Sequence, residues 1–175
     1  FFPDAALAWT PAIMILSVVA IIYGAYMAFA QTDFKKLIAY SSVAHMGYVT
    51  MGLFTMNVQG LQGAMFQMIS HGIVSPMLFL IVGVIYDRAH TRDIDGFGGL
   101  AARVPKYTGM VGLAFMASLG LTGLNGFVSE ALCLIGAFPV FTALTVIAAL
   151  GVIITAAYYL WTMQRVFLGK FNEVW

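Results

Sequence analysis

Residues 11–30 read PAIMILSVVAIIYGAYMAFA, a continuous stretch without a charged side chain. A helix rises about 1.5 Å per residue, so about 20 apolar residues cross the roughly 30 Å hydrocarbon core of a bilayer. The whole chain of 175 residues shares this character, with 62% hydrophobic and 9% charged residues. Soluble domains carry about 25% charged residues. The sequence therefore predicts an all-α fold, a polytopic transmembrane helix bundle.

Four further hydrophobic segments follow this first one along the chain. They cover about residues 34–56, 61–86, 107–138 and 140–168. Together with residues 11–30 they predict five spans in one transmembrane domain over residues 1–175. The chain begins Phe-Phe-Pro, without Met, and its last residues directly follow a hydrophobic segment. We therefore expect it to be a piece of a longer membrane protein.

The charged residues divide the predicted loops into two sides. With five spans, all eight Lys and Arg residues fall on the same side: Lys35, Lys36, Arg88, Arg92, Arg103, Lys106, Arg165 and Lys170. The opposite loops, around residues 57–60 and at Pro139, carry none. Because loops rich in Lys and Arg stay in the cytoplasm, we expect the basic loops and the C-terminal end on the cytoplasmic or matrix side. A net charge of +1 gives no sign of nucleic-acid binding.

The segment over residues 107–138 is too long for one regular span. About 31 residues would form a helix of roughly 46 Å, and Gly120, Gly123 and Gly126 lie close together in its middle. Glycine is a poor helix former, and non-helical backbone at membrane depth occurs where it lines a cavity or is buried in protein. We therefore predict a discontinuous helix, an element that forms ion sites in transporters.

Three ionisable side chains lie inside the predicted spans: His45, His71 and Glu130. An ionisable group at membrane depth is costly, and it marks a functional-site hypothesis by default. A neutral imidazole accepts a proton at one ring nitrogen while it donates from the other, and Glu130 follows the predicted break. These residues predict a proton relay. The alternative is a structural role as a hydrogen-bonded contact between helices. This alternative explains a buried histidine more easily than it explains the carboxylate of Glu130.

Polar side chains accompany these three residues. The supporting positions are Ser41, Gln67, Ser70, Ser75, Asn125 and Ser129. Residues four apart share a helix face, so Gln67, His71 and Ser75 form one polar stripe. Helix packing also accounts for many Ser and Thr positions, because their hydroxyls bond the carbonyl one turn earlier. The sequence has no metal-ligand cluster, phosphate loop or nucleophile–base pair, and its single Cys133 allows no internal disulfide. We expect no bond chemistry and no metal site in this chain.

Four stretches of the chain match long motifs of one membrane family. Residues 32–47 read TDFKKLIAYSSVAHMG, residues 67–72 read QMISHG, residues 86–92 read YDRAHTR and residues 126–130 read GFVSE. They resemble the antiporter-like proton-pumping subunits of respiratory complex I, the proton-translocating NADH:quinone oxidoreductase, and most closely the subunit M (mitochondrial subunit 4) type. The resemblance extends over nearly the whole chain.

The resemblance implies a role for each part of the chain. The five segments would be helices nine to thirteen of a fourteen-helix subunit, the half-channel nearer its C-terminus. The central-axis histidines of the family fall on His45 and His71, and its terminal carboxylate falls on Glu130. The chain would thus be a subunit of a redox-driven translocase that couples quinone reduction to proton transfer, without redox chemistry of its own.

The resemblance also implies surroundings for the chain. NADH, FMN, iron–sulfur clusters and quinone would be held by partner subunits of the complex. Other membrane subunits, in particular neighbouring antiporter-like subunits, and the lipid bilayer would contact this chain. The membrane would be a bacterial plasma membrane or an organellar inner membrane.

The chain departs from the family at two positions. Thr122 stands where the family usually has a proline in the helix break. Pro76 stands five residues after His71, where a small residue is more usual, and it should kink the helix. Two alternatives to a complex I subunit remain. One is a subunit of a multi-subunit cation/proton antiporter of the Mrp type, which shares this fold, and the other is a non-conducting structural membrane scaffold.

Overall fold

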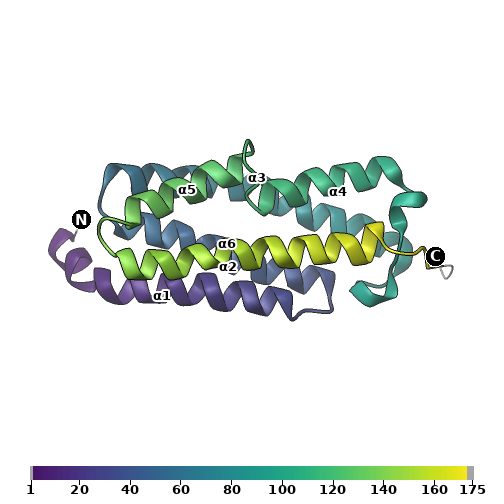
Figure 1. Cartoon of the computed structure of the whole chain (residues 1–175), viewed down its shortest axis with the longest axis horizontal. Coiled ribbons are helices and arrows are strands. Elements are labelled where there is room, and N and C mark those ends of the chain that lie inside the picture. Colours follow the sequence, from purple (N-terminus) through teal and green to yellow (C-terminus); the bar gives the residue numbers. More distant parts are fainter. Residues whose placement is uncertain (1, 173–175) are drawn as a thin grey trace.

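The computed structural model describes residues 2–172, and helices dominate that part of the chain. The α-helices are α1 (Pro3–Phe29), α2 (Phe34–Phe54), α3 (Val58–Ala89), α4 (Pro105–Ser118), α5 (Asn125–Ala137) and α6 (Thr142–Met163). Short 3-10 turns, η1 (Ile94–Gly96) and η2 (Leu100–Ala102), precede α4, and a π-helical turn, η3 (Gln164–Leu168), continues α6. Figure 1 shows one elongated bundle, which confirms the predicted all-α membrane fold. Residue 1 and residues 173–175 of the predicted domain lie outside the described residues.

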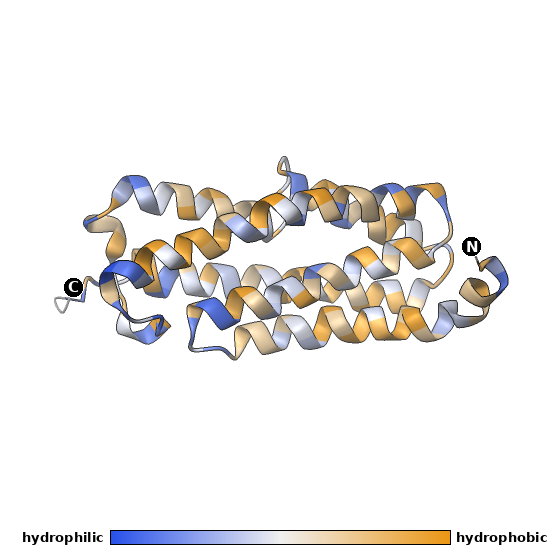
Figure 2. Cartoon of the chain, turned by 180° about the vertical axis from the view of Figure 1, so that it is seen from behind, coloured by the Kyte–Doolittle hydropathy of each residue, from blue (hydrophilic) through white to orange (hydrophobic). Residues whose placement is uncertain are grey.

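Four helices in the described part of the chain are long and apolar enough to cross a membrane: α1, α2, α3, and α6 together with η3. α1 begins at Pro3, earlier than the predicted start at Pro11, because a proline fits the first turn of a helix, where its missing N–H needs no partner. Large apolar side chains such as Leu16, Ile73 and Ile153 are more than half exposed. Hydrophobic residues make up most of the helical ribbon in Figure 2. The exposed apolar side chains suit contact with lipid, and the chain is a multi-pass membrane protein.

The predicted helix discontinuity is present. α4 and α5 lie end to end in Figure 1, and the loop 119–124 between them projects from the bundle. With 14 and 13 residues, each is shorter than the about 20 residues that a span requires. Gly120 (φ 76°) and Gly123 (φ 99°) have left-handed backbone, which other residues adopt only at a cost. Thr122 is exposed in this loop, so the helix ends here without the proline that the family usually has.

The helix α3 runs without interruption through Pro76. A proline has no N–H to bond the carbonyl four residues earlier, which here is the carbonyl of Gly72. The helix nevertheless continues on both sides of Gly72 and Pro76. The kink expected at Pro76 therefore stays a prediction, while a break at this point does not occur.

The loops that carry the basic residues meet at one end of the bundle, where the C-terminus lies in Figure 1. The amide of Phe34 donates to the carbonyl of Arg92 (2.9 Å), and the amide of Ile94 donates to the carbonyl of Thr32 (2.8 Å). The side chain of Arg92 also pairs with Asp33, with 3.4 Å between Nε and Oδ2. The connection between α1 and α2 is thus joined to the connection between α3 and α4.

Candidate functional site

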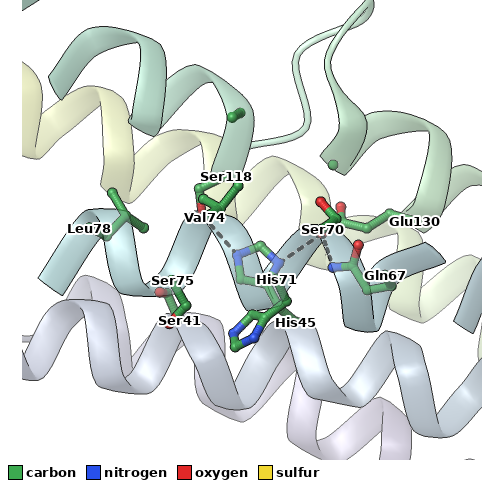
Figure 3. A pocket seen from close by; sticks show the side chains of 12 residues that line it. Ser41, His45, Gln67, Ser70, His71, Val74, Ser75, Leu78, Ser118 and Glu130 are labelled. Atoms are coloured by element: carbon green, nitrogen blue, oxygen red, sulfur yellow. Dashed lines mark hydrogen bonds and ion pairs between the residues drawn. The ribbon is translucent and has the colours of Figure 1, made fainter. Parts of the chain in front are cut away.

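A small cavity lies inside the bundle beside the helix break, lined by residues of α2, α3, α4 and α5 (Figure 3). Seven of the residues predicted for the site line it: Ser41, His45, Gln67, Ser70, His71, Ser75 and Glu130. The centre of a water molecule can occupy a volume of about 20 Å³ in this cavity. A polar cavity of about 10–15 Å³ on this measure accommodates one water. The predicted residues therefore surround a space that fits a single water.

Glu130 is the centre of the hydrogen bonding. It lies on α5 and is 4% exposed, and its Oε1 is 2.8 Å from Nδ1 of His45 on α2, which is 5% exposed. Nε2 of Gln67 on α3 donates to the same oxygen at 3.3 Å. A buried carboxyl group is tolerated where it is paired and hydrogen-bonded, and Glu130 has both kinds of partner. Three helices that are distant in sequence thus converge on one carboxyl group.

The second carboxyl oxygen faces the helix break. A Cβ placed on Gly120 would stand 3.5 Å from Oε2 of Glu130, an ordinary van der Waals distance. The backbone of the loop after α4 therefore lies close to this oxygen. The break and the carboxyl group belong to one site, as the spacing of Glu130 after the three glycines suggests.

Gln67 is oriented by Ser129. The Ser129 hydroxyl makes a short hydrogen bond to Oε1 of Gln67, and it also lies within reach of the carbonyls of Asn125 and Gly126 in its own helix. With its oxygen toward Ser129, the amide of Gln67 presents its nitrogen to Glu130. Asn125 contributes to the site through its backbone carbonyl, and its side chain does not line the cavity.

His45 connects the two halves of the broken span. Its Nδ1 meets Glu130 on α5, and its Nε2 is 3.3 Å from Oγ of Ser118 at the end of α4. Ser118 in turn donates to the hydroxyl of Tyr159 on α6 at 2.6 Å, and this hydroxyl is 3.0 Å from Oγ of Ser41. Both ring nitrogens of His45 therefore have partners in this structure.

His71 lies on the other side of the cavity and is half-buried. Its Nε2 is 2.8 Å from Oγ of Ser42, and its ring centroid is 6.1 Å from that of His45. Both nitrogens of His45 are directed to other partners, so the two rings share the cavity rather than a hydrogen bond. A proton that passes between the histidines would need a bridging water.

Ser42, Ser118 and Tyr159 were not among the predicted site residues. Ser42 stands next to Ser41 in a family motif, and Tyr159 belongs to a run of polar residues in α6, so a signal existed for both. Ser118 gave no signal, because a single serine before a glycine-rich stretch has many explanations. Among residues 2–172, no group of three or more His, Cys, Asp or Glu side chains could hold a metal ion.

Comparison with known proteins finds similarity over most of the chain. Residues 1–155 match a family model described as "NADH:quinone oxidoreductase/Mrp antiporter, TM". NADH-quinone oxidoreductase subunit M of Rhodobacter capsulatus is 55% identical over 169 residues, which cover 97% of this chain and 33% of that protein. The chain thus spans about a third of the length of the curated relatives it matches.

Solved structures agree in fold. A chain in respiratory complex I from Thermus thermophilus with bound NADH superposes with a TM-score of 0.95 at 34% identity, over 98% of this chain and 37% of that chain. A chain in the Mrp complex from Dietzia sp. DQ12-45-1b superposes with a TM-score of 0.90 at 24% identity, over 97% of this chain and 32% of that chain. The second match is a likeness of fold alone.

Proposed function

Because the chain belongs to the transmembrane family shared by NADH:quinone oxidoreductase and Mrp antiporters, and is a homologue of NADH-quinone oxidoreductase subunit M, we propose that it forms a proton half-channel in respiratory complex I. It is the half-channel nearer the C-terminus of the subunit. The redox cofactors, NADH, FMN, iron–sulfur clusters and quinone, are bound by partner subunits. This chain contributes only the movement of protons that quinone reduction drives.

The contact between His45 and Glu130 is the observation that carries this proposal. It places a hydrogen-bonded acid–base pair in the interior of a membrane bundle, beside a break in the helix that supplies the acid. A proton moves readily across a direct contact of 2.8 Å. His71 supplies protons to this pair through the water-sized cavity, and Glu130 exchanges them with one side of the membrane.

The remaining predicted residues support the pair. Gln67 and Ser129 hold the carboxyl group, Ser41 belongs to the hydrogen bonds behind His45, and Ser70 and Ser75 give the cavity polar walls. The helices form one transmembrane domain of five spans, in which α4 and α5 together make the fourth. The basic loops face the cytoplasm or matrix, following the positive-inside rule.

An exchange of Glu130 for Gln in the full-length subunit tests the function. The amide keeps the shape of the side chain but cannot take up and release a proton, so proton pumping by the complex in proteoliposomes should fall strongly. Asp95→Asn is the matched control, because Asp95 is exposed and pairs with Arg165 at the basic end of the bundle. Pumping at the wild-type level in E130Q would overturn the proposal, provided that quinone reduction shows an assembled complex.

Two alternatives have less support. A role in an Mrp-type antiporter rests on the shared family and on a fold match at 24% identity, against 34% for the complex I structure. The neighbouring genes distinguish the two, since complex I requires hydrophilic NADH and iron–sulfur subunits. A structural scaffold does not require an acid–base pair in the bundle interior, and Glu130 that stays ionised at every pH would favour it.

A further inference from the structure

We propose that Ser118, Tyr159 and Ser41 form an oriented hydrogen-bond chain that keeps a proton on Nε2 of His45. His45 then exchanges protons with Glu130 through Nδ1 alone. The three hydroxyl residues act as positioning residues, because they act through His45 and not on the transferred proton. The consequence for pumping rests on the function proposed above, whereas the protonation state of His45 can be tested independently.

The direction of the chain follows from the number of protons on its hydroxyls. Each serine or tyrosine hydroxyl has one proton to donate. Ser41 donates its proton to the carbonyl of Ile38, one turn earlier in α2, at 2.8 Å. Its oxygen also contacts the hydroxyl of Tyr159 at 3.0 Å. Since the proton of Ser41 is already used, the proton in this second contact comes from Tyr159.

The same reasoning carries the direction on to the imidazole. With its own proton given to Ser41, the oxygen of Tyr159 accepts from Ser118 at 2.6 Å. The proton of Ser118 is then used as well, so the contact of 3.3 Å between Ser118 and Nε2 of His45 needs a proton on the nitrogen. The reverse direction would leave two oxygen lone pairs facing each other between Tyr159 and Ser41. Only one arrangement supplies a proton to every contact.

A fixed proton on Nε2 determines what happens at Nδ1. The 2.8 Å contact between Nδ1 and Oε1 of Glu130 holds one proton. When this proton is on the nitrogen, the pair is an imidazolium and a carboxylate. When it is on the oxygen, the pair is a neutral imidazole and a carboxylic acid. The transfer breaks one N–H bond and forms one O–H bond, and the net charge of the pair stays zero throughout. A neutral pair suits a buried site, since an unpaired charge is costly there.

The chain of hydroxyls anchors His45 and does not conduct protons away from it. It ends on the carbonyl of Ile38, which accepts a hydrogen bond but cannot pass a proton on. The link to Ser118, at 3.3 Å, is the longest contact of the series. Exchange with His71 across the cavity therefore requires the imidazole to leave Ser118 for a moment, because both nitrogens of His45 are otherwise occupied.

Tyr159→Phe in full-length subunit M of the intact complex removes one oxygen and keeps the ring that packs on Phe115. Ser118 then has no acceptor and can donate to Nε2, which favours the tautomer of His45 with its proton on Nδ1. Tyr158→Phe is the nearest comparison, because the hydroxyl of the neighbouring Tyr158 is also buried and lies close to Ser41 and Tyr159, but it is not a link between them and His45. Both variants lose the same atom from adjacent positions.

Infrared spectra of the complex with ring-labelled histidine report the protonation of His45, whose bands are assigned by their loss in a variant that lacks this histidine. We expect bands of the Nε2–H imidazole or of the imidazolium in the wild type and in Tyr158→Phe. In Tyr159→Phe the population of the Nδ1–H form relative to the Nε2–H form should rise about five-fold, because the Nε2–H form loses the stabilisation of about one hydrogen bond. The ratio of protons pumped to quinone reduced should also fall in Tyr159→Phe alone.

Two results would overturn the inference. One is an Nδ1–H tautomer of His45 in the wild type, and the other is a Tyr159→Phe variant whose histidine bands match those of Tyr158→Phe. A shifted tautomer together with unchanged pumping in Glu130→Gln would instead retain the oriented chain and reject the proposed function. The two proposals therefore fail on different measurements.

Discussion

Gly126 of α5 lies against the backbone of Ala117 in α4: a Cβ added to Gly126 would stand 2.3 Å from the carbonyl oxygen of Ala117. Side-chain atoms do not approach a carbonyl so closely, so the two half-helices meet here because residue 126 has no side chain. Glu130 follows Gly126 by about one turn. The position of the carboxyl group in the cavity therefore depends on this contact between the backbones of α4 and α5.

Gly126→Ala should displace α5 from α4 and move Glu130 away from His45. Overpacking of this kind lowers the free energy of unfolding by about 1–3 kcal/mol. We therefore expect a lower thermal stability of the complex together with reduced pumping. Gly109→Ala in α4 is the matched control, because a Cβ at that position meets nothing within 4 Å. Equal thermal stability and equal pumping in the two variants would contradict the importance of the contact.

Gln67→Leu should reduce pumping more than it reduces quinone reduction. The leucine has a similar size but cannot donate to Oε1 of Glu130, a contact of 3.3 Å. Loss of one hydrogen bond typically costs about 0.5–1.5 kcal/mol, and the carboxyl group is then held in the cavity through its contact with His45. Gln62→Leu is the control, since Gln62 lies on the same helix and is exposed. The same pumping-to-reduction ratio in both variants would argue against a role for the amide.

Much of the fold follows from patterns that the sequence displays directly. Apolar stretches of span length predict the long helices, and the cluster of Gly120, Gly123 and Gly126 predicts the break because glycine is a poor helix former. The break has no proline, and Gly120 and Gly123 adopt left-handed backbone in it. The start of α1 at Pro3 was not predicted, because Pro11 also suits the first turn of a helix, whereas α1 runs through it.

Part of the candidate site could also be predicted from the sequence, and part could not. Ionisable residues in apolar segments are visible in a sequence, and the structure brings His45, His71 and Glu130 to one cavity. The contacts that Ser118 and Tyr159 make at this site could not be predicted, since they are decided by how α4 and α6 pack against α2. A helical stripe indicates which residues share a face, but it does not indicate which residue of another helix meets them. The functional roles stay predictions until pumping is measured.

Asp33→Ala should destabilise the basic end of the bundle more than Arg92→Gln does. Both changes remove the ion pair between the two residues, which is partly exposed, and such pairs contribute about 0–1 kcal/mol. Asp33 also accepts a hydrogen bond from the amide of Lys36 and so caps α2, a contact worth about 1 kcal/mol. Thermal unfolding of the full-length subunit in detergent would compare the two. Because Asp33→Ala removes the ion pair as well, a larger loss in Arg92→Gln would contradict the importance of the cap and would assign the difference to the contact of Arg92 with the Tyr86 ring.

His71 offers a test of whether water completes the relay. The rings of His45 and His71 lie 6.1 Å apart across a cavity that fits one water. His71→Ala enlarges this cavity, whose walls include Ser70 and Ser75, so additional water can enter and carry the proton. His71→Leu fills the space with an apolar side chain and excludes that water.

A relay through water therefore predicts that pumping falls more in His71→Leu than in His71→Ala. A purely structural role predicts the opposite order, because alanine leaves a void and leucine restores packing. Initial pumping rates in proteoliposomes, divided by the rate of quinone reduction, measure the order directly. Both variants should retain more pumping than Glu130→Gln, since water can replace an imidazole that shuttles protons but cannot replace the carboxyl group that stores one. Greater loss in His71→Ala would assign His71 to packing and leave Glu130 and His45 as the core of the relay.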